Sequence, residues 1–136
     1  MSRVSALIVV RLDAAGDRVP LPARLSYDAE DPYVVRATFF DGHEVLARWH
    51  FDRQMLADGL RRPVGDGDVR FAPHTEAGVE EVRMALRGPS AAGQGHAVLF
   101  VDARALADFL DRTYDTVGAG EEFLDVDRLL AEFLAG

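Results

Sequence analysis

Histidine is the side chain best suited to bind a metal or to act as a general base at neutral pH. The chain has four: His43, His50, His74 and His96. Two metal ligands on one strand must share a face, which requires an even separation, whereas His43 and His50 are seven residues apart. His74 and His96 have no second ligand at a recognisable spacing. We therefore expect no metal site and no cofactor.

Nucleophilic catalysis requires a hydroxyl or thiol group beside a base. The chain has no cysteine, which excludes thiolate chemistry, disulfides and Cys-ligated zinc. Ser90 lies in the sequence Gly-Pro-Ser-Ala-Ala, which lacks the second glycine of a nucleophile elbow. Acidic pairs such as Glu80 and Glu81 lie in polar segments, where a solvated carboxylate is a poor general acid. The sequence therefore predicts no catalytic residues.

All 15 basic residues are arginine, and 23 acidic residues give the chain a net charge of -8. The absence of lysine excludes the P-loop and Schiff-base chemistry. A negative field of this size repels phosphate backbones, so we expect no nucleic acid partner. The aromatic residues that could stack bases on a sheet are Tyr27, Tyr33, Phe39, Phe40 and Trp49. Two alternatives stay open: a single-stranded nucleic-acid-binding module, and a small hydrolase that uses aspartate and histidine.

Hydrophobic periodicity places these residues on a mainly β chain. The length of 136 residues fits one domain, residues 1–136. Alternating or β-branched segments predict strands at residues 4–12, 23–27, 33–40, 43–50, 69–72, 79–87 and 96–101. Asp52, Asp102 and Asp125 are suited to cap three helices. The predicted order is ββββ-α-βββ-αα, an α+β fold with an antiparallel curved sheet or half-barrel and its helices at one end.

Turn-forming residues predict how the strands connect. The dipeptide Asp41-Gly42 predicts a type I′ turn between two strands. Pro20 and Pro22 place the next strand near a sheet edge, because proline cannot donate to a ladder. Residues 61–68 contain a proline and two glycines and predict a polar loop, and residues 88–95 predict a flexible connection.

The C-terminal residues carry an amphipathic helical pattern. Its apolar stripe consists of Val126, Leu129, Leu130, Phe133 and Leu134. Burial of such side chains is worth ~1.5–3 kcal/mol each. The stripe therefore predicts a core contact or a contact between subunits.

The apolar run at residues 7–10 is the segment closest to a membrane signal. It is far shorter than a membrane-spanning helix and is followed by no signal-peptide cleavage pattern. We therefore expect a cytoplasmic protein without direct membrane insertion.

Three stretches in register are similar to a known family. Residues 25–39 read LSYDAEDPYVVRATF, with the Tyr-Asp, Asp-Pro-Tyr and Ala-Thr-Phe elements of that family. Residues 49–60 read WHFDRQMLADGL and are followed at 63–69 by PVGDGDV. Residues 103–110 read ARALADFL and precede an Arg-Thr pair. Together they cover most of the chain and resemble the SsgA-like proteins of actinobacteria.

The resemblance implies a fold, a function and partners. The fold is a β core with flanking helices, assembled as a bell-shaped homotrimer. It is similar to whirly-type domains that bind single-stranded nucleic acids, a likeness of folds that transfers no function. The implied function is non-catalytic and concerns septum placement during sporulation. The implied partners are the tubulin-like division protein FtsZ and sister SsgA-like proteins, with recruitment from the cytoplasm to the division septum.

The polar loop at residues 61–68 is the predicted partner-binding surface, because loops on rigid scaffolds often carry recognition. Its charged residues are Arg61, Arg62, Asp66 and Asp68. The structural alternative is that its proline and glycines only turn the chain.

Overall fold

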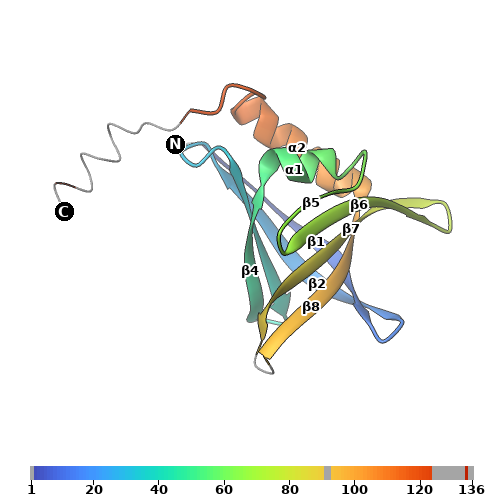
Figure 1. The fold of residues 1–136 in the computed structure, drawn as a ribbon. Helices are drawn as coiled ribbons and strands as arrows, with labels where there is room; N and C mark the ends of the chain where they lie inside the picture. Colours follow the sequence, from blue (N-terminus) through green and yellow to red (C-terminus); the bar gives the residue numbers. More distant parts are fainter. Residues whose placement is uncertain (1, 91–92, 124–133, 135–136) are drawn as a thin grey trace.

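Eight antiparallel strands form one curled sheet with two helices gathered at one end of it (Figure 1). The computed structural model describes residues 2–90, 93–123 and 134. The strands are β1 Arg3–Ala14, β2 Asp17–Asp28, β3 Val34–Asp41, β4 Glu44–Asp52, β5 Val64–Asp66, β6 Val69–Glu76, β7 Val79–Ser90 and β8 Gly93–Asp102. The helices are α1 Arg53–Asp58 and α2 Ala103–Thr116. The strand order is β4-β3-β2-β1-β8-β7-β6-β5, which confirms the predicted fold class.

Strand β5 is missing from the sequence prediction, so the order in the described residues is ββββ-α-ββββ-α. It lies inside the predicted loop 61–68 and pairs only with β6. A three-residue edge strand with glycine at its centre has too few side chains to show alternation. The predicted loop is therefore largely the hairpin between β5 and β6.

Strand β2 lies inside the sheet, so the prediction that it lies near an edge was wrong. It pairs with β1 along its whole length but with β3 only from Ala23 to Tyr27. Pro20 and Pro22 lie in the part of β2 that has a strand partner on one side only. A missing N–H group is tolerated there.

Two connections differ from the sequence prediction. The β3–β4 hairpin is confirmed, but Asp41 pairs with Glu44, so its two-residue turn is formed by Gly42 and His43. Gly42 alone in this turn has a positive φ, 60°, which is the pattern of a type II′ turn rather than type I′. Within the predicted flexible connection at 88–95, residues 88–90 are paired with residues 93–95 at the end of the β7–β8 hairpin.

The core fills the concave face of the sheet, and α2 closes it. Strand β1 pairs with β8 only from Val10 to Leu12, and α2 packs on β1, β7 and β8. The buried side chains of α2 are Leu106, Phe109, Leu110 and Thr113. The helices start where predicted: the Asp52 side chain accepts the Met55 N–H at 2.8 Å, and that of Asp102 accepts the Ala105 N–H at 2.9 Å.

The predicted third helix and most of the apolar stripe fall outside the described residues. These are the positions of Asp125, Val126, Leu129, Leu130 and Phe133. Leu134 is described and is exposed. Whether the stripe forms a core or a subunit contact stays a prediction.

Gly59, at the end of α1, provides a test of how α1 packs on the sheet. Its φ is -62°, which any residue can adopt, but a Cβ atom there would lie 2.5 Å from the Cβ of Phe71. Because that atom is fixed to the β6 backbone, no rotamer change relieves the clash. We expect Gly59→Ala to lower the free energy of unfolding by about 1–3 kcal/mol in urea denaturation. Gln54→Ala, on the exposed side of α1, should change it by about 0.5 kcal/mol or less; equal effects would contradict this packing.

Candidate partner-binding surfaces

Arg53 anchors the helical end of the molecule. Its side chain is 1% exposed. The guanidinium group donates to the carbonyl oxygens of Thr113 and Val117 at 3.1 and 2.7 Å and forms an ion pair with Glu122 at 2.8 Å. Arg53 therefore holds the end of α2 and the segment after it against α1.

Two tyrosine rings enclose this guanidinium group. Its central carbon lies 4.0 Å from the ring centre of Tyr114 and 4.9 Å from that of Tyr27. Burial raises the pKa of both tyrosine hydroxyls, and the hydrogen bond from Arg53 lowers the pKa of the Glu122 carboxyl. At neutral pH the tyrosines are thus uncharged and Glu122 is ionised, which favours the ion pair and the cation–π contacts.

A groove of about 560 Å³ runs between the two helices. The small side chains of three alanines leave space in this groove. Its apolar residues are Ala57, Leu60, Ala103, Ala107, Leu110 and Tyr114. Its charged residues are Arg61, Glu80, Arg104 and Asp111. Such a lining is suited to an apolar side chain or short segment flanked by charged groups.

The predicted partner-binding residues lie in two separate places. Arg61 lines this helical groove. Arg62 is exposed and pairs with Asp58 at 3.1 Å. Asp66 is exposed at the end of β5, and Asp68 lines a second depression, on the sheet. The four residues therefore do not form one site.

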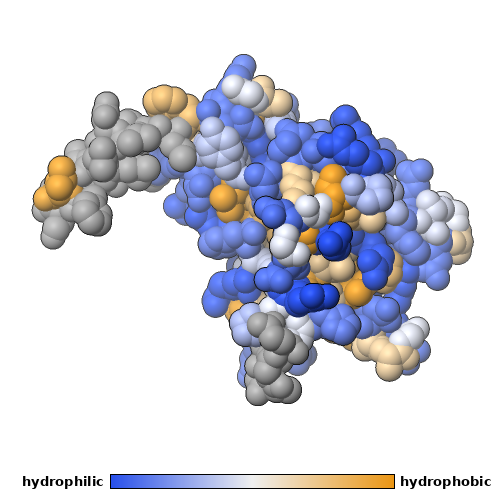
Figure 2. All heavy atoms as spheres, in the orientation of Figure 1, coloured by the Kyte–Doolittle hydropathy of each residue, from blue (hydrophilic) through white to orange (hydrophobic). Residues whose placement is uncertain are grey.

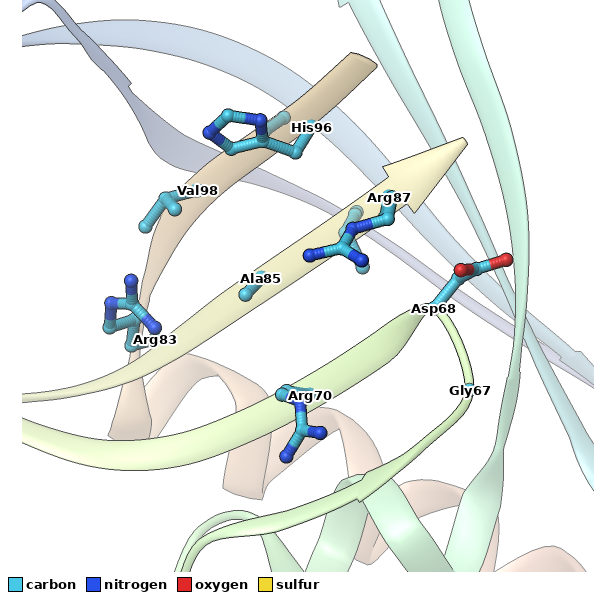
Figure 3. A pocket seen from close by; sticks show the side chains of 10 residues that line it. Gly67, Asp68, Arg70, Arg83, Ala85, Arg87, His96 and Val98 are labelled. Atoms are coloured by element: carbon cyan, nitrogen blue, oxygen red, sulfur yellow. The ribbon is translucent and has the colours of Figure 1, made fainter. Parts of the chain in front are cut away.

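The second depression, here named the arginine pocket, was missed by the sequence analysis. It lies on the face of β6, β7 and β8 that points away from the core and has a volume of about 300 Å³. Its lining includes Arg70, Arg83, Ala85, Arg87, His96 and Val98 (Figure 3). These residues are spread over three strands, so no local motif identifies them.

His74, Glu76 and Glu81 form a group that could hold a metal ion, with ligand atoms within 4.8 Å of one another. Sequence spacing did not reveal it, because β6 and β7 meet only through the sheet register. A guanidinium group already engages these ligands: Arg18 donates to Glu81 at 2.8 Å and to Nε2 of His74 at 3.4 Å, and it also pairs with Glu76. Arg18 also lies over the Phe100 ring, with its central carbon 3.8 Å from the ring centre.

The bond with Glu81 raises the pKa of Arg18 above its usual value, so the charge on this group is fixed. Since arginine can only donate, the lone pair of His74 Nε2 is directed at Arg18 in this contact. Arg18, His74, Glu76 and Glu81 thus form a network of ion pairs and hydrogen bonds on the sheet.

The aromatic residues considered for base stacking do not form an exposed platform. Tyr27 and Phe39 are buried in the core. Trp49 is partly buried and stacks on Phe51, with ring centres 6.2 Å apart. Tyr33 is exposed, and its hydroxyl donates to the Glu122 carbonyl oxygen at 3.3 Å. This arrangement gives the nucleic-acid alternative no support.

Comparison with protein families gives one match over most of the chain. The sequence model of the family described as "Streptomyces sporulation and cell division protein, SsgA" matches residues 21–122. The chain belongs to the SsgA family. The matched region contains Arg53, both helices and all the strands except β1 and the start of β2.

Relatives within the SsgA family are similar over nearly their whole length. The sporulation-specific cell division protein SsgB of Streptomyces coelicolor is 43% identical over 135 residues, which cover 97% of this chain and 96% of that protein. The SsgB protein of Thermobifida fusca is 39% identical over 88% of this chain and 86% of its own.

A solved structure confirms the fold. The crystal structure of the SsgA-like sporulation-specific cell division protein from Thermobifida fusca has a TM-score of 0.84 and 36% identity, over 97% of this chain and 96% of that one. In the part of this SsgA-family chain that the structure describes, neither helix is long and apolar enough to cross a membrane.

Replacing Arg53 tests its role as an anchor. We expect Arg53→Ala to lower the free energy of unfolding by about 3–5 kcal/mol, because it breaks a buried ion pair with Glu122 and removes the hydrogen bonds that Arg53 donates to two carbonyl groups. Arg62→Ala, whose side chain is 66% exposed, should change it by about 0.5 kcal/mol or less. Urea denaturation of both variants measures the difference; similar values would contradict the anchoring role.

The ion pair between Arg53 and Glu122 should make stability depend on pH. The pKa of Glu122 is lowered from its ordinary value of 4.5 in the folded protein, so its contribution is fully present above that pH and is lost as the pH falls through the lowered value. We expect the wild type to be more stable than Glu122→Gln at neutral pH and the difference to shrink below 4.5.

The exposed residue Glu44 supplies the control for this experiment, as Glu44→Gln. Its stability difference from the wild type should stay nearly constant across the same pH range. A Glu122→Gln difference that is equally constant would show that the ion pair contributes nothing.

Proposed function

We propose that this protein is a non-enzymatic adaptor in sporulation-specific cell division, which positions or recruits FtsZ for assembly of the division septum. One observation carries the proposal: relatives that are 43% and 39% identical over most of the chain are sporulation-specific cell division proteins. The protein acts from the cytoplasm and is recruited to the septum.

The side chains support an adaptor rather than an enzyme. His43, His50 and His96 are exposed, and His74 belongs to the ion-pair network of Arg18. Among the described residues, the hydroxyl groups of Thr113 and Thr116 donate to carbonyl oxygens of their own helix. An adaptor needs no nucleophile–base pair, only a stable surface that a partner can contact.

The groove between α1 and α2 is the proposed contact for FtsZ. Arg61 and Arg104 line it, and their side chains form no ion pair or hydrogen bond with another described residue, so their charges are available to a partner. Arg62 lies next to Arg61 in the chain. Asp66 and Asp68 are placed on the neighbouring hairpin, where a bound partner of sufficient size reaches them.

Self-association into a homotrimer, and contact with sister SsgA-like proteins, are part of the same proposal. The outward face of β1 supports it, because Leu7 is 69% and Val9 58% exposed. Apolar strand residues in such positions are typical of surfaces that are covered in an assembly.

Co-sedimentation with purified FtsZ polymers tests the function. We expect the wild type to sediment with FtsZ and Arg61→Ala/Arg62→Ala to bind several-fold more weakly. Its melting temperature should be nearly unchanged, because exposed charge changes cost little stability. Arg48→Ala, an exposed arginine on β4, is the matched control and should bind like the wild type.

Two outcomes would contradict this account. If the wild type does not sediment with FtsZ but binds a single-stranded oligonucleotide tightly at physiological salt, the nucleic-acid alternative replaces the proposal. If the double variant binds FtsZ as well as the wild type does, the contact lies outside the helical groove.

A further inference from the structure

The arginine pocket is built around one small residue, Ala85, at the centre of β7. Arg83 and Arg87 lie two residues before and after it on the same face of the strand. Across the sheet, Ala85 pairs with Arg70 of β6 and with Val98 of β8. Figure 3 shows Arg70, Arg83, Arg87 and His96 on four sides of this alanine. The pocket is thus a short apolar floor with a basic rim.

The three arginines of the pocket lack partners within the protein. None of Arg70, Arg83 and Arg87 forms a hydrogen bond or an ion pair with its side chain to another described residue. By contrast, Arg18 and Arg53 are each paired with a carboxylate. The net charge of the chain is -8, but the charge at this pocket is positive. Its three guanidinium groups repel one another, and a bound anion reduces that repulsion.

The nearest acidic residue of the pocket does not neutralise it. The backbone of Asp68 is fixed by a hydrogen bond, because its carbonyl oxygen accepts the Arg87 N–H at 2.9 Å. Its carboxylate points away from the three guanidinium groups in Figure 3. The stem of Arg70 lies over its strand partner Gly65, where a Cβ would be 2.8 Å from its Cγ.

We propose that the arginine pocket docks an acidic peptide segment of a protein partner, with a carboxylate side chain seated over Ala85. A guanidinium group matches the geometry of a carboxylate and can bind it with two hydrogen bonds. Val98 and Ala85 contact the methylene groups of a glutamate. Arg83 and Arg87 are separated by about 13 Å along the strand, which equals the spacing of carboxylates four residues apart on an extended peptide. This inference rests on the proposed adaptor function in one respect, namely that the partner is a protein.

A peptide fits the surroundings of the pocket better than a nucleic acid does. A phosphate backbone gains its affinity from many cationic contacts along a continuous track. The pocket offers three guanidinium groups in about 300 Å³. Further along the same face, Glu81 and Glu76 are joined to Arg18. Figure 2 shows a face that is mostly hydrophilic, with small hydrophobic areas between the charged groups.

Binding of a fluorescent hexaglutamate peptide, followed by anisotropy, tests the pocket itself. We expect saturable binding to the wild type that weakens with salt. Arg83→Gln/Arg87→Gln should weaken it about tenfold or more, since hydrogen bonds to a charged group are lost. Ala85→Leu keeps every charge but fills the floor and should weaken it to a similar degree. Arg48→Gln, which removes an exposed arginine on β4 outside both depressions, should stay within about twofold of the wild type.

Melting temperatures of all variants establish that each is folded before binding is compared. Absence of saturable binding to the wild type, or equal binding by Ala85→Leu, overturns the proposal. The proposal is also overturned if a hexathymidylate oligonucleotide binds the wild type more tightly than the peptide does and binds the same variants more weakly. The outcome is independent of FtsZ co-sedimentation. The wild type can sediment with FtsZ without binding the peptide, and it can bind the peptide without sedimenting with FtsZ.

Discussion

Arg53 is buried where the two helices meet the curled sheet. The shape of the groove between the helices depends on the hydrogen bonds and the ion pair of its guanidinium group. The sheet does not close on itself, because β4 and β5 form its two edges, so helices must cover the open end of the core. Apolar contacts from Leu106 and Phe109 supply that cover. They are non-directional, whereas the bonds of Arg53 to the end of α2 fix one position of α2 relative to α1 and therefore the shape of the groove between them.

The arginines divide into two groups with different roles. Those paired with carboxylates, such as Arg18 and Arg53, connect elements that are far apart in sequence. In the part of the chain that the structure describes, the arginines whose side chains have no hydrogen bond, ion pair or ring contact are Arg48, Arg61, Arg70, Arg83, Arg87 and Arg104. All of these except Arg48 line the helical groove or the arginine pocket. Arginine is enriched in protein interfaces, so unpaired arginines beside a depression are suited to a protein-binding surface.

Local patterns in the sequence determine much of the fold. Alternation predicted the long strands, and the capping aspartates, Asp52 and Asp102, marked the starts of α1 and α2. Strand β5 escaped because a three-residue edge strand carries no period. Arg53 was overlooked because arginine usually lies at the surface, and the partners of its side-chain hydrogen bonds are sixty or more residues away. The arginine pocket could not be predicted either, since it needs the register that sets Arg70 opposite Ala85.

The central proposal is that FtsZ contacts the groove between α1 and α2. Backbone amide chemical shifts of the ¹⁵N-labelled protein, recorded with and without unlabelled FtsZ, locate the contact residue by residue. We expect the shifts to concentrate at Leu60 and Ala107, which line the helical groove. Shifts confined to the outward face of β1, around Leu7 and Val9, would contradict it.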